Sequence, residues 1–106
     1  MITLYIRYTL DPNKLQDFEI YAKALATPIE RCGGVPAGYC LPTKVAGPMN
    51  SAIGLIEFPS LAAYEKYREK LGADPEATEV TRRVWASGCI LNEDRSIVSL
   101  VPETRR

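Results

Sequence analysis

The sequence predicts an α+β domain in which a four-stranded antiparallel sheet carries its helices on one face. Three observations support this class. Residues 2–10 and 51–58 are rich in β-branched and aromatic side chains, which is typical of strands. A helical pattern with proline or serine at its start follows each of them. The two helical segments share a weak spacing of large residues, LxxFxxY from residue 15 and LxxYxxY from residue 61, which indicates two related halves.

The first strand, residues 2–10, alternates apolar even positions with a mixed odd face. That odd face carries Tyr5 and Arg7 between threonines. Such a surface suits contact with a partner that is not purely apolar. The residues of 2–10 alone do not say what packs against it.

The first helix is expected to begin at Asp11-Pro12, an N-cap followed by proline at the first helical position. One apolar stripe then recurs at spacings of three and four: Leu15, Phe18, Ala22, Leu25 and Ile29. Pro28 predicts a kink or a break near Ala26, because proline lacks an N–H and clashes with the preceding turn. Gly33-Gly34 is expected to end the helix.

Residues 35–43 predict a second strand, at a sheet edge because it contains Pro36 and Pro42. Turn signals occupy residues 47–50. Residues 51–58 predict a third strand whose two faces are both largely apolar.

Two helices and a strand complete the chain. Ser60 should cap a helix that ends at Gly72, and Asp74-Pro75 should open another that ends at Gly88. The side chains expected on the packed sides of these helices are Leu61, Tyr64, Tyr67 and Leu71, then Ala77, Val80 and Val84 with Trp85 beside them. Residues 95–101 predict the last strand. The order β-α-β-β-α-α-β matches the ferredoxin-like arrangement.

Composition limits the function. Thirteen basic and thirteen acidic residues leave no net charge, so neither nucleic acid nor a membrane surface is an expected partner. The 106 residues are expected to form one domain, 1–106. Cys32, Cys40 and Cys89 lack a Cys-x-x-Cys spacing and are expected to be reduced thiols in a cytoplasmic protein. The chain has no histidine, so we expect no metal and no resident cofactor, and chemistry would fall to Tyr, Arg, Asp/Glu, Lys, Cys or a borrowed cofactor.

The strand at 51–58 predicts a homodimer. Its even positions, Ala52 to Phe58, are apolar or small, and its odd positions include Ile53, Leu55 and Glu57. One layer of helices covers one face only. At roughly 25 cal/mol per Å² of apolar surface, leaving the other face wet would forgo several kcal/mol. We therefore expect a second copy stacked on it.

Several short segments occur in a defined order: YTLDPNKL (8–15), Pro28-Ile29, Gly33-Gly34, Gly38-Tyr39, GPMN (47–50), FPSL (58–61) and ADPE (73–76). Together they resemble the NIPSNAP family of the dimeric α/β-barrel superfamily. The resemblance implies a two-chain barrel with helices outside and a small pocket in each subunit, usually between sheet and helices. It implies no single activity, since the superfamily includes cofactor-independent monooxygenases, haem-degrading enzymes, isomerases and dehydratases.

The chain also departs from its nearest family. A histidine and a tryptophan often seen on the third strand correspond to Gly54 and Ile56. The family's early arginine falls at Ile6, with Arg7 one place over and therefore on the other face of the strand. We therefore do not expect Arg7 to have the role of the family's early arginine.

Arg7 and Glu57 are the candidate catalytic pair, because both lie within strands expected to be neighbours, toward the same end of their apolar runs. Arg7 would bind an anion or enolate, and Glu57 would position it or act as a base. The alternative is a structural ion pair or a bridge across the dimer interface.

Four aromatic residues are candidate ligand-binding groups. The hydroxyls of Tyr5 and Tyr39 could hydrogen-bond a substrate, and Tyr64 and Trp85 could form an aromatic wall. Ordinary core packing is the alternative for each.

The resulting hypothesis is a homodimer that binds a small apolar, aromatic or acidic metabolite. Cofactor-independent oxygenase or isomerase chemistry, and a non-catalytic binding or assembly module with a structural Arg7–Glu57 pair, both stay open.

Overall fold

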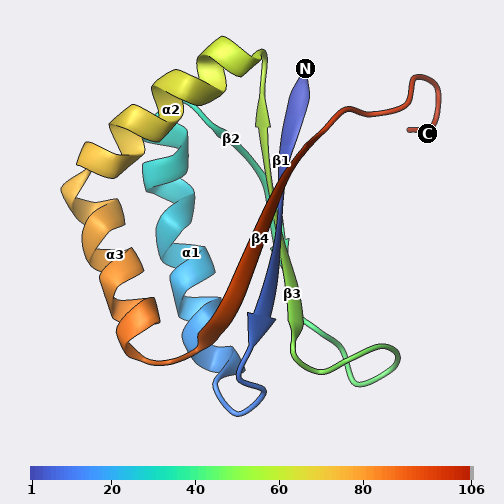
Figure 1. Ribbon diagram of the computed structural model, residues 1–106, viewed down its shortest axis with the longest axis vertical. Coiled ribbons are helices and arrows are strands. Elements are labelled where there is room, and N and C mark those ends of the chain that lie inside the picture. Colours follow the sequence, from blue (N-terminus) through green and yellow to red (C-terminus); the bar gives the residue numbers. More distant parts are fainter. Residues whose placement is uncertain (106) are drawn as a thin grey trace.

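The computed structural model describes residues 1–105 and shows the expected element order. The elements are β1 (Ile2–Leu10), α1 (Leu15–Arg31), β2 (Val35–Cys40), β3 (Ser51–Phe58), α2 (Leu61–Ala73), α3 (Pro75–Ala86) and β4 (Ile90–Val98). The helices form one layer on one side of the sheet, and the residues after β4 lead away from them (Figure 1). The ferredoxin-like α+β fold is confirmed.

The sheet has the order β2-β3-β1-β4, and every pair of neighbours is antiparallel. β1 therefore lies in the centre, with β3 on one side and β4 on the other. Its register sets Ile6 opposite Gly54 of β3 and Arg95 of β4. Since facing residues point to the same side of a sheet, even positions of β1 and β3 share one face with the odd positions of β4.

The hydrophobic core lies between this face and the helices. β1 contributes Leu4, Ile6, Tyr8 and Leu10, each at most 2% exposed. Phe58 of β3 and Phe18 of α1 are completely buried. In β4, by contrast, only Ile90 is fully buried, because the helix layer does not extend over the rest of this edge strand. The helix side of β4 is thus accessible.

Helix α1 differs from prediction at two places. Asp11 does not cap α1. Its side chain accepts from the Asn13 N–H and closes a short turn, so the helix begins at Leu15. Pro28 does not divide α1, which is continuous to Arg31. Pro28 lies in the last turn of the helix and its ring is buried, so a single missing N–H is tolerated.

The other boundaries were mostly predicted correctly. Ser60 Oγ caps α2 by accepting from Ala63 N, although α2 continues past Gly72 to Ala73. β2 is the expected edge strand but ends at Cys40. The last strand is wrong: β4 covers 90–98, whereas 95–101 was expected. The segment from Asn92 to Arg95 is polar, so it does not show the apolar pattern by which a strand is predicted. It is nevertheless a strand because its backbone pairs with β1.

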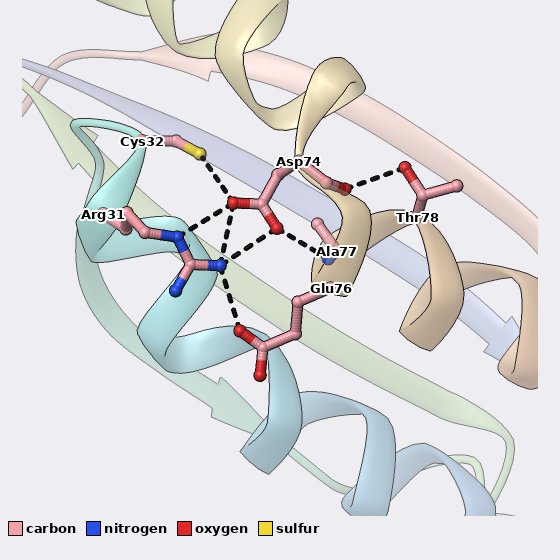
Figure 2. Close-up of polar contacts among 6 residues, drawn as sticks. All are labelled: Arg31, Cys32, Asp74, Glu76, Ala77 and Thr78. Atoms are coloured by element: carbon pink, nitrogen blue, oxygen red, sulfur yellow. Dashed lines mark hydrogen bonds and ion pairs between the residues drawn. The ribbon is translucent and has the colours of Figure 1, made fainter.

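Asp74 joins the three helices (Figure 2). Its carboxylate caps α3 by accepting from Ala77 N at 3.0 Å, and it also accepts from Nε of Arg31, at the end of α1, at 2.9 Å. Arg31 donates in addition to Glu76 at 2.9 Å. The Ala77 N–H and the Arg31 guanidinium hold the pKa of Asp74 below its ordinary value. This cluster fixes the corner between α2 and α3, which frames the site described next. No helix among residues 1–105 has the length and apolar character needed to cross a bilayer.

Candidate functional site

A pocket of about 340 Å³ lies between α2, α3 and β4. Its walls are Tyr67, Arg68, Leu71 and Gly72 of α2, Ala77, Thr78 and Thr81 of α3, and Arg95 of β4. The residues from each helix are one and about four positions apart, so they lie on one side of that helix. The corner held by Asp74 turns these two sides toward each other.

Arg95 is the charged group that β4 places in this pocket. It lies opposite Ile6 on the helix side of the sheet, and its Nε donates to the carboxylate of Glu93 two residues earlier. The side chain of Glu93 is 16% exposed and that of Arg95 is 51% exposed. The pair therefore lies at the boundary between core and solvent, with the arginine on the open side.

A cluster of tyrosines lies beside this ion pair. Tyr8 of β1, Tyr39 of β2 and Tyr21 of α1 lie close together, and the ring centroids of Tyr8 and Tyr39 are 6.2 Å apart. Burial is the main cause that raises the pKa of all three, and the charge of Glu93 raises it further. These hydroxyls therefore stay protonated at neutral pH. They can donate a hydrogen bond to an oxyanion, but they cannot serve as bases.

Gly54 makes room for Tyr39. A Cβ atom built on Gly54 would lie 2.7 Å from Cε2 of the Tyr39 ring, closer than real contacts allow. The ring also packs near Tyr8 and Phe18, with centroids 6.2 Å and 6.0 Å away. The absence of a side chain at position 54 is what lets Tyr39 reach the tyrosine cluster.

The predicted catalytic pair lies on the other face of the sheet. Arg7 is exposed and lies opposite Ile53, whereas Glu57 lies opposite Thr3. Arg7 and the partner of Glu57 are four positions apart along β1, which separates the two side chains by about 13 Å at the rise of a strand. Both residues lie toward the C-terminal ends of their strands, and antiparallel pairing sets those ends at opposite ends of the sheet, so the expected ion pair within one chain is wrong. Arg7 instead stacks on Tyr5, 5.9 Å from its ring centroid.

The four predicted ligand-binding aromatics are divided among three places. Tyr5 shares the outer face with Arg7. Tyr39 and Tyr64 lie on the helix side, where Tyr64 packs edge-on against Phe58 and stacks on Tyr67. Trp85 is 45% exposed on α3 and is not among the residues that line the α2–α3–β4 pocket.

Arg95, Arg68 and Tyr67 were not predicted as site residues. A signal existed for Arg95: Glu93, Arg95 and Ile97 alternate with outward positions as a strand would. It was hidden because the strand was expected to begin only at Arg95. Arg68 reaches the pocket through the placement of α2 beside α3, which no local pattern indicates. Within residues 1–105, no three His, Cys, Asp or Glu side chains are grouped so as to hold a metal ion.

Known structures share this fold. A family model described as NIPSNAP matches residues 4–104. The structure of Atu4242 from Agrobacterium tumefaciens is similar with a TM-score of 0.84 and 18% identity, covering 97% of this chain and 96% of that one. An uncharacterized NIPSNAP-like domain protein from Burkholderia xenovorans is similar with a TM-score of 0.80 and 23% identity, covering 99% of this chain and 89% of that one. A putative antibiotic biosynthesis monooxygenase from Nitrosomonas europaea is similar with a TM-score of 0.70 and 9% identity, covering 95% of this chain and 99% of that one.

No curated protein matches the sequence. At these identities the structural neighbours establish the fold only, whereas the family model covers nearly the whole chain. The protein therefore belongs to the NIPSNAP family.

Proposed function

We propose that this protein is a cytoplasmic homodimer in which each subunit binds one small metabolite in the α2–α3–β4 pocket. The observation that carries the proposal is the pocket itself, whose lining combines Arg95 with the apolar residues Leu71 and Ala77. A volume of about 340 Å³ lies in the range of small-molecule sites, which are mostly apolar with a few polar groups. The three cysteines are free thiols, which suits a reducing compartment.

The outer face of the sheet supports the dimer. Tyr5, Ile53 and Leu55 are only half-buried there, and Val98 is 43% exposed. Beside them lies a hollow of about 800 Å³, whose walls include Leu55, Glu57 and Val98. A second copy brings the same apolar groups, and two-fold stacking allows Arg7 of one chain to approach Glu57 of the other. On this proposal, the residues predicted to be catalytic belong to the dimer face.

The dimer can be tested with Leu55→Asp, which places a charge at the centre of the outer face. We expect the wild type to sediment as two chains and the variant as one folded chain with unchanged circular dichroism. Ile20→Asp is the matched control, because Ile20 is an exposed apolar residue on the helix layer. A wild type that sediments as one chain at micromolar concentration, or a variant that stays dimeric, would contradict the proposal.

Ligand binding can be tested by thermal stability against a library of small metabolites, because a ligand that binds the folded state raises Tm by mass action. Thr81→Trp is the control variant, since Thr81 lines the pocket and a larger side chain would fill it. Compounds that stabilise the wild type should lose their effect on this variant. If no compound raises Tm, or if the filled variant responds equally, the pocket is not a binding site.

A further inference from the structure

We infer that the ligand of the α2–α3–β4 pocket carries an anionic group, a carboxylate or a phosphate monoester, that Arg95 and Arg68 bind together. This inference rests on the proposed binding function and names the chemical class of its ligand. It depends on charge, on unused hydrogen-bond donors and on size.

The pocket has a charge that the whole chain lacks. Basic and acidic residues balance over the full sequence, yet the charged residues that line this pocket are Arg68 and Arg95, both cationic. Glu93 compensates only one of them, through its bond to Arg95. One positive charge therefore remains for a bound anion to balance.

The guanidinium groups of Arg95 and Arg68 both have N–H donors that are not used in hydrogen bonds among the described residues. Within residues 1–105, the hydrogen bond that Arg95 makes uses Nε, which leaves its two terminal nitrogens for another acceptor. Arg68 lies over the ring of Tyr64, 5.9 Å from the centroid, and has no ion pair among the described residues. The Arg68 side chain is exposed, so its N–H groups are open to an acceptor. Two such forks suit the paired oxygens of a carboxylate or phosphate.

The remaining walls suit the body of a small organic acid. Leu71 and Ala77 are apolar, and Thr81 adds a hydroxyl. Burial raises the pKa of Tyr67, so its hydroxyl stays protonated and can donate to an oxyanion. A pocket of about 340 Å³ accommodates a single aromatic ring with a short acidic arm.

The experiment uses pairs of aromatic acids and their primary amides, which differ in charge but hardly in shape. The pairs are benzoate with benzamide and phenylacetate with phenylacetamide, and phenyl phosphate is added to distinguish phosphate from carboxylate. Affinity for the full-length dimer is measured by titration followed by NMR. We expect at least one acid to bind about tenfold or more tightly than its amide, because hydrogen bonds to charged groups are the stronger ones.

The variants Arg95→Gln and Arg68→Gln should each weaken binding of that acid by about tenfold. Arg95→Lys, which keeps the charge but loses the fork, should fall between wild type and Arg95→Gln. Arg82→Gln is the control, because Arg82 is an exposed arginine of the same helix layer that pairs with Glu79. Circular dichroism and sedimentation establish that each variant is folded and dimeric.

Each result separates the two claims. Three results would overturn the inference that the ligand is anionic. They are equal affinity for acids and amides, no binding by any acid, and an Arg95→Gln variant that binds as well as the wild type. If neutral compounds nevertheless raise Tm in a way that Thr81→Trp abolishes, the proposed binding function stands without it. If no compound of the library raises Tm, both the proposed binding function and the anionic ligand are contradicted.

Discussion

The contact between Gly54 and Tyr39 predicts a strong coupling between these two positions. In Gly54→Ala the new methyl group would lie 2.7 Å from Cε2 and 3.0 Å from Cζ of the ring. The ring has little room to rotate away, because it packs near the rings of Tyr8 and Phe18, with centroids 6.2 Å and 6.0 Å away. Overpacking of this kind costs about 1–3 kcal/mol. Replacing a strand glycine by alanine recovers about 0.5–1 kcal/mol of backbone entropy.

The expected net loss for Gly54→Ala is therefore about 0–2.5 kcal/mol in the free energy of unfolding. Each kcal/mol lost lowers Tm by roughly 4 °C or more. In a Tyr39→Ala background the same methyl group meets no ring, and Gly54→Ala should be neutral or stabilising. The double-mutant cycle should thus give a coupling of about 1–3 kcal/mol, the overpacking cost itself. Urea unfolding at one fixed protein concentration measures it, since the stability of the proposed dimer would depend on concentration.

Gly72→Ala provides the matched control. A Cβ there has no heavy atom within 4 Å, and the position lies within helix α2, so this variant should gain about 0.5–1 kcal/mol. Equal destabilisation by Gly54→Ala with and without the Tyr39 ring would show that the ring does not set the cost. The account of how Tyr39 reaches the tyrosine cluster would then be refuted.

Three further outcomes are expected. Tyr8→Phe removes a buried hydroxyl that lies near Tyr39 and Tyr21 and should cost about 1 kcal/mol of stability, measured by urea unfolding; no loss would mean that this hydroxyl contributes nothing. Burial raises the pKa of Tyr8 and Tyr21, so their contribution is complete below the ordinary tyrosine value of 10.0 and is lost as pH rises above it. Tyrosinate absorbance should therefore show two or more tyrosines ionising only as the protein unfolds, and a smooth titration of all six would exclude this. The pKa of Asp74 is lowered, so its contribution is complete at neutral pH and is lost as pH falls through the folded value; Asp74→Asn should reduce the acid dependence of the urea midpoint.

Local sequence signals predicted the elements whose ends are set by neighbouring residues. Ser60 and Asp74 cap α2 and α3 through their own side chains, and β3 is apolar enough to be recognised without knowledge of its partners. Asp11 misled because an aspartate followed by proline serves a turn as well as a helix cap, and only the tertiary structure decides between them. β4 was misplaced because an edge strand with an accessible side can be polar.

The site was harder to predict than the fold for a geometric reason. Adjacent strands were correctly expected for Arg7 and Glu57, but their separation depends on register, and no short-range pattern specifies it. Arg68 and Arg95 lie 27 positions apart by number, on a helix and a strand that are not neighbours in the chain. Their shared pocket follows from the angle between α2 and α3, which packing determines. Alternation within β4 was the one clue available.

The central place of β1 has a consequence for how the chain reaches its native state. β1 is the first strand to be made, yet one of its edges is completed only by β4, where Thr3 pairs with Val98. Contacts between such distant residues form slowly, so a nascent or truncated chain that lacks β4 would present the backbone of an apolar strand to its surroundings. Such a species invites strand addition by other chains. Shortened forms ending before residue 90 should therefore accumulate as aggregates during expression.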